Sequence, residues 1–165
     1  MNKLKFTAGE QPGTYVISSA VSEEDILLMA NSIARRRLSK GVALTSPTAT
    51  RLYIQTLVQT KEHEVFGVIF MDNQNKVIVA EELFRGTIDS ASVYPREVVK
   101  RTLELNSAAL IFYHNHPSGE PEPSRNDRSL TERLIAALRL VDVRVLDHIV
   151  ACSEGTVSFA ERGYL

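Results

Sequence analysis

Two histidines separated by one residue follow a short apolar segment in the second half of the chain. Residues 108–113 are typical of a buried strand, and His114 and His116 come directly after them. Because alternate side chains of a strand point to the same face, the two imidazoles should lie side by side, where they can share one metal ion. Asp127 falls in the first turn of a helix predicted to begin near Arg125, so its carboxylate can supply a third ligand.

Three protein ligands leave the fourth tetrahedral position of a zinc ion open for water, as in catalytic zinc sites. A helix cap is the competing interpretation, because Ser124 and Asp127 have the spacing of a capping box. The full pattern is His-x-His, seven residues, Ser, two residues and Asp. Such a set of identities at fixed spacings favours a site for one Zn²⁺ ion.

This pattern resembles the JAMM (MPN+) metallopeptidase motif, and residues 114–119, His-Asn-His-Pro-Ser-Gly, are similar to its bacterial RadC branch. The resemblance covers about residues 45 to 165. The chain resembles a short form of the family that lacks the N-terminal helix-hairpin-helix segment of full-length RadC proteins. Further RadC-like segments are Glu64–Gly67, Gly86-Thr87, Tyr94–Glu97, Asp147–Ile149 and Ser158-Phe159.

The resemblance implies a zinc-dependent metallopeptidase or isopeptidase that hydrolyses an amide bond in a protein or peptide substrate. His114, His116 and Asp127 would be the metal ligands. By the match to the Glu-Val-x-Gly segment of the family, Glu64 would be the general base that takes a proton from water. Ser124 would donate a hydrogen bond to the oxyanion of the tetrahedral intermediate.

Asp147 and His148 interrupt an otherwise apolar strand. An ionisable pair inside such a segment normally has partners. Alternation along the strand places the two side chains on opposite faces, so at most one can face the metal. We expect a role that supports the site or the fold rather than metal ligation. Cys152 has no basic neighbour in sequence and is predicted to be a small core residue rather than a nucleophile.

The order of predicted elements indicates an α/β (α+β) fold with one mixed β-sheet flanked by helices, and the resemblance implies JAMM/MPN (cytidine-deaminase-like) architecture. We expect an N-terminal arm and helix over residues 1–44 and the RadC-like domain over residues 45–165. The arm is expected to hold one short strand near residues 15–17. Helices are predicted to start at Ser22, Ser46, Pro95 and Arg125, and strands to span residues 65–71, 76–83, 108–113 and 143–151.

The composition of the chain limits its possible binding partners and its cellular location. With 165 residues, of which 44% are hydrophobic, the chain can bury one core, and its net charge of −1 attracts neither nucleic acid nor anionic lipid in general. A single cysteine excludes an internal disulfide and a cysteine-based zinc site. No apolar segment approaches membrane-spanning length, and residues 1–13 do not resemble a signal peptide. We therefore expect a cytoplasmic protein without membrane contact.

A DNA-repair-associated protein that binds or acts on DNA, or on a DNA-bound partner, is the alternative, because the RadC branch carries that label. The basic cluster Arg35–Arg37 could contact phosphates, but cations at a helix C-terminus are also favoured by the helix macrodipole. A nucleoside deaminase would need a Pro-Cys-x-x-Cys segment, which one cysteine cannot provide. A domain that binds its target without cutting it is disfavoured by the complete set of ligands.

Overall fold

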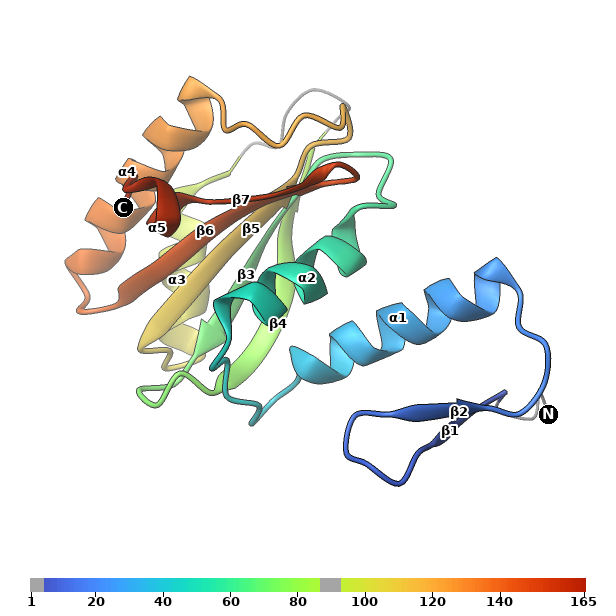
Figure 1. Cartoon of the computed structure of the whole chain (residues 1–165). Helices are drawn as coiled ribbons and strands as arrows, with labels where there is room; N and C mark the ends of the chain where they lie inside the picture. The colour runs from blue at the N-terminus through green and yellow to red at the C-terminus, as the bar shows by residue number, and fades with distance from the viewer. Residues whose placement is uncertain (1–4, 87–92) are drawn as a thin grey trace.

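A mixed five-stranded sheet in the order β4-β3-β5-β6-β7 lies at the centre of the protein (Figure 1). The computed structural model describes residues 5–86 and 93–165. Thr87, in one of the RadC-like segments, and the first four residues of the predicted arm lie outside the described residues. The strands are β3 (Val65–Met71), β4 (Val77–Arg85), β5 (Ala109–Asn115), β6 (Arg144–Cys152) and β7 (Gly155–Ser158).

Helices cover both faces of the sheet, which confirms the predicted α/β fold (Figure 1). Helix α2 (Pro47–Val58) packs on one face, and α3 (Pro95–Glu104) and α4 (Arg125–Arg139) pack on the other. The predicted caps at Ser46 and Ser124 are confirmed, since both side chains accept a hydrogen bond from the first turn of their helix. The short helix α5 (Phe159–Arg162) and strand β7 were not predicted as separate elements.

Strand pairing brings three chain segments to one edge of the sheet. Strand β3 pairs antiparallel with β5, whereas β5 pairs parallel with β6 through the α4 crossover. The amino end of β3 therefore lies beside the carboxyl end of β5. The chain leaves β5 at this edge after Asn115 and enters α4 at Arg125, ten residues later. All segments that carry the predicted site residues consequently meet at one end of β5.

The side chains of β5 divide between two cores. Ala109, Ile111 and Tyr113 pack with α2 on one face, and Leu110 and Phe112 pack with α3 and α4 on the other. This division is the alternation that the sequence predicts, and it continues beyond the apolar residues. Because it does, the next even-numbered side chain, that of residue 114, faces α4.

The N-terminal segment extends away from the sheet (Figure 1). It consists of a two-stranded antiparallel sheet, β1 (Phe6–Ala8) with β2 (Tyr15–Ile17), and helix α1 (Glu23–Arg37), which begins with a capping box between Ser22 and Asp25. The prediction of one strand in this arm was incomplete, because three-residue strands that are mostly exposed leave no periodic pattern. Among the described residues, no helix has the length and apolar composition needed to cross a membrane.

Gly67 of β3 lies against the ring of Tyr113, its partner in the β3–β5 ladder. A Cβ atom on residue 67 would lie 2.1 Å from Cζ of Tyr113, a distance that real contacts do not reach. Only a residue without a side chain therefore lets β3 and the buried tyrosine share this face.

We predict that Gly67→Ala lowers the free energy of unfolding by roughly 1–3 kcal/mol, because the added methyl group overpacks the core against Tyr113. Urea denaturation measures the loss. In a Tyr113→Ala background the same substitution should cost much less, since the clash is gone. Equal losses in both backgrounds would contradict this explanation.

Candidate metal centre

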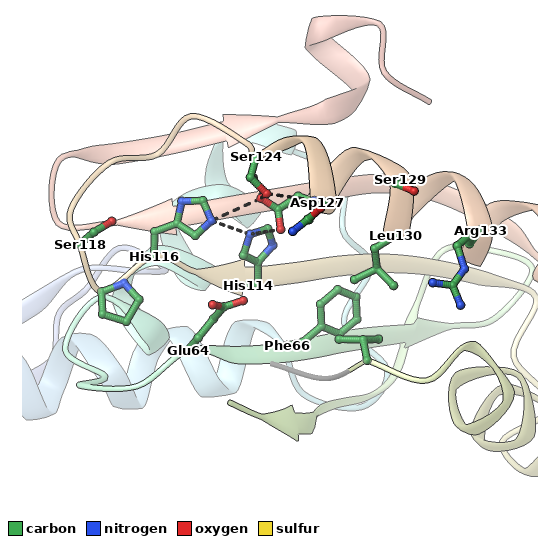
Figure 2. Close-up of a pocket in the computed structure, with 13 residues that line it drawn as sticks. Glu64, Phe66, His114, His116, Ser118, Ser124, Asp127, Ser129, Leu130 and Arg133 are labelled. Carbon is green, nitrogen blue, oxygen red and sulfur yellow. Dashed lines mark hydrogen bonds and ion pairs between the residues drawn. The ribbon is translucent and has the colours of Figure 1, made fainter. Parts of the chain in front are cut away.

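His114, His116 and Asp127 converge at the carboxyl end of β5 (Figure 2). The Nε2 atoms of the two histidines are 2.9 Å apart. Oδ1 of Asp127 lies 3.5 Å from Nε2 of His114, and Oδ2 lies 3.6 Å from Nε2 of His116. Ligand atoms of a tetrahedral zinc ion, bound at about 2.0–2.1 Å, are about 3.3 Å from one another. The type and spacing of these donors therefore fit a single zinc ion.

A capping box orients the carboxylate of Asp127. The backbone N–H of Ser124 donates to Oδ2 of Asp127 at 2.7 Å, and the Ser124 hydroxyl donates to the same oxygen at 2.6 Å. The N–H of Asp127 in turn donates to the serine oxygen. These bonds occupy Oδ2, whereas Oδ1 is directed at His114. Asp127 can therefore complete the helix cap with one carboxylate oxygen and present the other as a metal ligand.

A buried chain of hydrogen bonds determines which nitrogen of His114 carries the proton. Thr131 donates its hydroxyl hydrogen to the carbonyl oxygen of Asp127 at 2.6 Å, so its oxygen must accept from Nδ1 of His148, also at 2.6 Å. Nε2 of neutral His148 is then unprotonated and accepts from Nδ1 of His114 at 2.8 Å. Nε2 of His114 is left with a lone pair that faces the cluster.

His116 is oriented in the same sense by the loop that follows β5. Its Nδ1 donates to the carbonyl oxygen of Glu120 at 2.7 Å, because a carbonyl can only accept. In the neutral ring Nε2 is therefore also unprotonated. Two nitrogen lone pairs and a carboxylate oxygen would then face one another with no hydrogen between them, an arrangement that either a metal ion or a proton on His116 relieves. The convergence of these three ligand atoms is the feature of the structure that best suits a metal.

The three histidines of the site differ in pKa because their surroundings differ. Burial lowers the pKa of His114 to about 4 and that of His148 well below its ordinary value, which keeps both rings neutral. The contact with Asp127 raises the pKa of His116 despite partial burial. Burial alone would raise the pKa of Asp127, but the neighbouring His116 and His114 hold it well below its usual range. Without a metal, His116 is the ring that takes up a proton.

Glu64 is brought to the cluster by the pairing of β3 with β5. Phe66 lies opposite His114 in the ladder, and continuing this antiparallel register by two residues places Glu64 opposite His116. Figure 2 shows the half-buried Glu64 beside both histidines, with its carboxylate directed at them. Glu64 also lines the same cleft of about 530 Å³ as the three clustered residues. Its part in catalysis stays a prediction.

Asn115 is a positioning residue that the sequence analysis did not identify. It lies between the two histidines on the opposite face of β5 and is buried. Its Oδ1 accepts from the N–H of Val65 at 2.8 Å, and its Nδ2 donates to the carbonyl of His63 at 3.1 Å. These bonds hold the backbone on both sides of Glu64. The available signal was an amide side chain directly after a predicted buried strand.

Asp147 and His148 point to opposite sides of β6, as alternation predicts. His148 contacts His114, whereas Asp147 accepts hydrogen bonds from the hydroxyl of Ser158 at 2.6 Å and the N–H of Ala160 at 3.0 Å. Asp147 therefore secures the start of α5. The predicted burial of Cys152 is confirmed, and its thiol donates to the carbonyl of Gly119 in the loop after the histidines.

Ser124 differs from the expectation in one respect. It lines the cleft, but its hydroxyl hydrogen is directed at Asp127 rather than into the open space where substrate would lie. Donation to an oxyanion therefore requires the hydroxyl to rotate, and this role stays a prediction. The loop residue Ser118 also lines the cleft.

A mixed sheet between helices, with this cluster at the end of a central strand, defines an α/β domain of the JAMM/MPN type. The RadC-like JAB domain family matches residues 44–164, and the chain belongs to this family.

The relatives of the chain include proteins of similar and of greater length. It is 50% identical over 151 residues to a UPF0758 protein of Vibrio cholerae, and the matched region covers 92% of this chain and 95% of that protein. It is 52% identical over 145 residues to a UPF0758 protein of Vibrio atlanticus, covering 88% of this chain and 65% of the relative. A UPF0758 protein of Methylibium petroleiphilum is 58% identical over 137 residues, 81% of this chain and 62% of the relative. The chain thus spans less than two thirds of the last two relatives.

We predict that Thr131→Val weakens zinc binding by about 10- to 100-fold, because it removes the hydroxyl that holds His148 and, through it, the tautomer of His114. Competition with a chelator measures the affinity. Thr102→Val is the matched control, since Thr102 is also buried and bonds the carbonyl four residues earlier, but in α3. Equal affinities in both variants would contradict the proposed chain.

We also predict that the metal-free protein loses stability as the pH falls from 6.5 towards 4. In this range His114 and His148 bind protons when unfolded but not when buried, so each favours unfolding as the pH decreases. His114 alone contributes a slope of about 1.4 kcal/mol per pH unit. Asp127 changes the stability only below this pH range, because its pKa is shifted downward. His116 changes it only above this range, because its pKa is shifted upward.

Urea denaturation in the presence of a chelator, at a series of pH values, measures this slope. His148→Gln should reduce it, because one of the two rings is removed. A stability that is constant or rises as the pH decreases would show that the histidines are not buried in neutral form.

Proposed function

We propose that this protein is a zinc-dependent metallopeptidase or isopeptidase of the JAMM type, which hydrolyses an amide bond in a protein or peptide substrate. The observation that carries the proposal is the convergence of two imidazole lone pairs and a carboxylate, with Glu64 beside them, in one cleft. We place its action in the cytoplasm, where a free thiol such as that of Cys152 stays reduced.

His114, His116 and Asp127 would hold the zinc ion through two nitrogens and one oxygen. When bound, the ion would act as a Lewis acid and lower the pKa of a water molecule in the remaining position to near 7. Glu64 would accept a proton from this water at its carboxylate and later deliver it to the nitrogen of the leaving amine. Its place opposite His116 in the β3–β5 register supports this role.

The surrounding residues would orient these groups and restrict water. Asn115 holds the backbone on both sides of Glu64, and the Ser124 bonds hold Asp127. The buried ring of Phe66 packs next to His114 and closes the floor of the cleft, where a lower dielectric strengthens charge interactions. After rotation of its hydroxyl, Ser124 would donate to the developing oxyanion. The alternative of a DNA-associated role stays a prediction of the family resemblance.

We predict that the purified protein binds about one equivalent of zinc and that Asp127→Ala loses it, because one of only three protein ligands is removed. Elemental analysis measures the metal content. Asp25→Ala is the matched control, since it removes the same kind of capping box from α1 and should leave zinc in place. Zinc-free protein that is fully folded under zinc-replete conditions would overturn the proposal.

We further predict that Glu64→Gln retains zinc but lowers amide hydrolysis by about 10²- to 10⁴-fold, because the proton acceptor is lost while the ligands remain. Substrates can be found by mass spectrometry as peptides that the unsubstituted protein releases from a cell extract. Glu62→Gln, which changes an exposed carboxylate two residues away, should keep the activity. Release of the same peptides by the Glu64→Gln variant would exclude Glu64 as the base.

A further inference from the structure

The cleft continues past the cluster of His114, His116 and Asp127 along one face of α4 (Figure 2). Asn126, Leu130 and Arg133 line it, at the three- and four-residue spacing that brings side chains to the same side of a helix. Asp127, on the first turn, marks the metal end. The cleft therefore runs parallel to α4 for about two turns beyond the cluster.

The middle of the cleft is apolar. Phe66 of β3, Val93 before α3 and Leu130 of α4 line it from three different elements. Phe66 is buried in the core, whereas Val93 and Leu130 are half-buried, so part of their apolar surface faces the open space. A group that lies here next to the cluster would remove this surface from water.

The guanidinium of Arg133 lies at the far end of the cleft. Figure 2 shows the side chain of Arg133 extending from α4 towards the cleft. Within residues 5–86 and 93–165, Arg133 forms neither an ion pair nor a hydrogen bond, and its exposure leaves the guanidinium accessible. Arg128 of the same helix, by contrast, bonds Tyr164 and lies over its ring. A guanidinium next to the apolar part of the cleft, unpaired within the described residues, is suited to bind a carboxylate.

We propose that Arg133 selects substrates in which a hydrophobic side chain next to the scissile bond is followed by a carboxylate. The inference rests on the proposed function, because the cluster defines where the scissile bond lies. Arg133 comes six residues after Asp127 in the helix, an advance of about 9 Å. An extended peptide covers this distance in two to three residues. The substrate class is therefore a peptide with an acidic group two or three residues from the bond that is cut.

Hydroxamate ligands test the proposal without turnover, because the hydroxamate binds zinc directly. Three compounds share a leucine-like side chain next to the hydroxamate. The first ends in a free carboxylate two residues further on, the second ends in a carboxamide, and the third carries a glutamate side chain before a carboxamide. Calorimetry on the zinc-loaded protein measures each affinity, and the first and third compounds distinguish a peptide C-terminus from an acidic side chain.

We expect one or both charged compounds to bind about three- to tenfold more tightly than the neutral one at low salt, with a smaller ratio at high salt because exposed charges are screened. Arg133→Gln should abolish this preference and leave the affinity for the neutral compound unchanged. Arg139→Gln is the matched control, since Arg139 is an exposed arginine of α4 that does not line the cleft. It should keep the preference.

The possible failures are distinguishable. Equal binding of charged and neutral compounds, or a preference that survives Arg133→Gln, would overturn the role of Arg133 while the zinc site stands. If no hydroxamate binds the protein under zinc-replete conditions, the proposed function and this inference fail together.

Discussion

A chain of hydrogen bonds from the backbone of α4 to His114 is the interaction on which the candidate centre depends. It passes through Thr131 and His148. The two links that His148 makes, to Thr131 and to His114, are buried, so no water can replace a partner lost there. Because a carbonyl at one end can only accept, the direction of every hydrogen in the chain is determined. As a result, Nε2 of His114 is unprotonated and faces the candidate ligand atoms of His116 and Asp127.

The start of α4 combines a structural and a chemical task. Asp127 satisfies the N–H of Ser124 with one carboxylate oxygen and presents the other to His114. A capping box is favourable in any helix, and α1 contains one at Ser22 and Asp25, where the carboxylate pairs with Lys5. The α4 cap has the same hydrogen bonds but lies at the edge of the sheet where β5 ends. The position of the cap in the fold, rather than the capping motif itself, places this carboxylate beside the two histidines.

Strand β5 supports the centre from both of its faces. Its even-numbered residues pass from the apolar core to the histidine cluster, whereas its odd-numbered residues pass from the second core to Asn115. Asn115 then bonds the backbone around Glu64, so one strand positions both the ligand-like histidines and the predicted base. A shift of register by one residue would exchange these two sets of side chains. The close contact between Gly67 and Tyr113 opposes such a shift.

The sequence by itself determined the fold class, the positions of most helices and strands, and the pattern of His114, His116, Ser124 and Asp127, because periodicity, capping residues and fixed spacings are local properties. It indicated Glu64 only through the family resemblance, and it did not identify Asn115 or Thr131. Their partners lie far away in the chain, at the ends of other strands and helices. Only the tertiary structure, through the β3–β5 register and the packing of α4 on β6, decided that these groups meet, since no local pattern encodes which distant segments become neighbours.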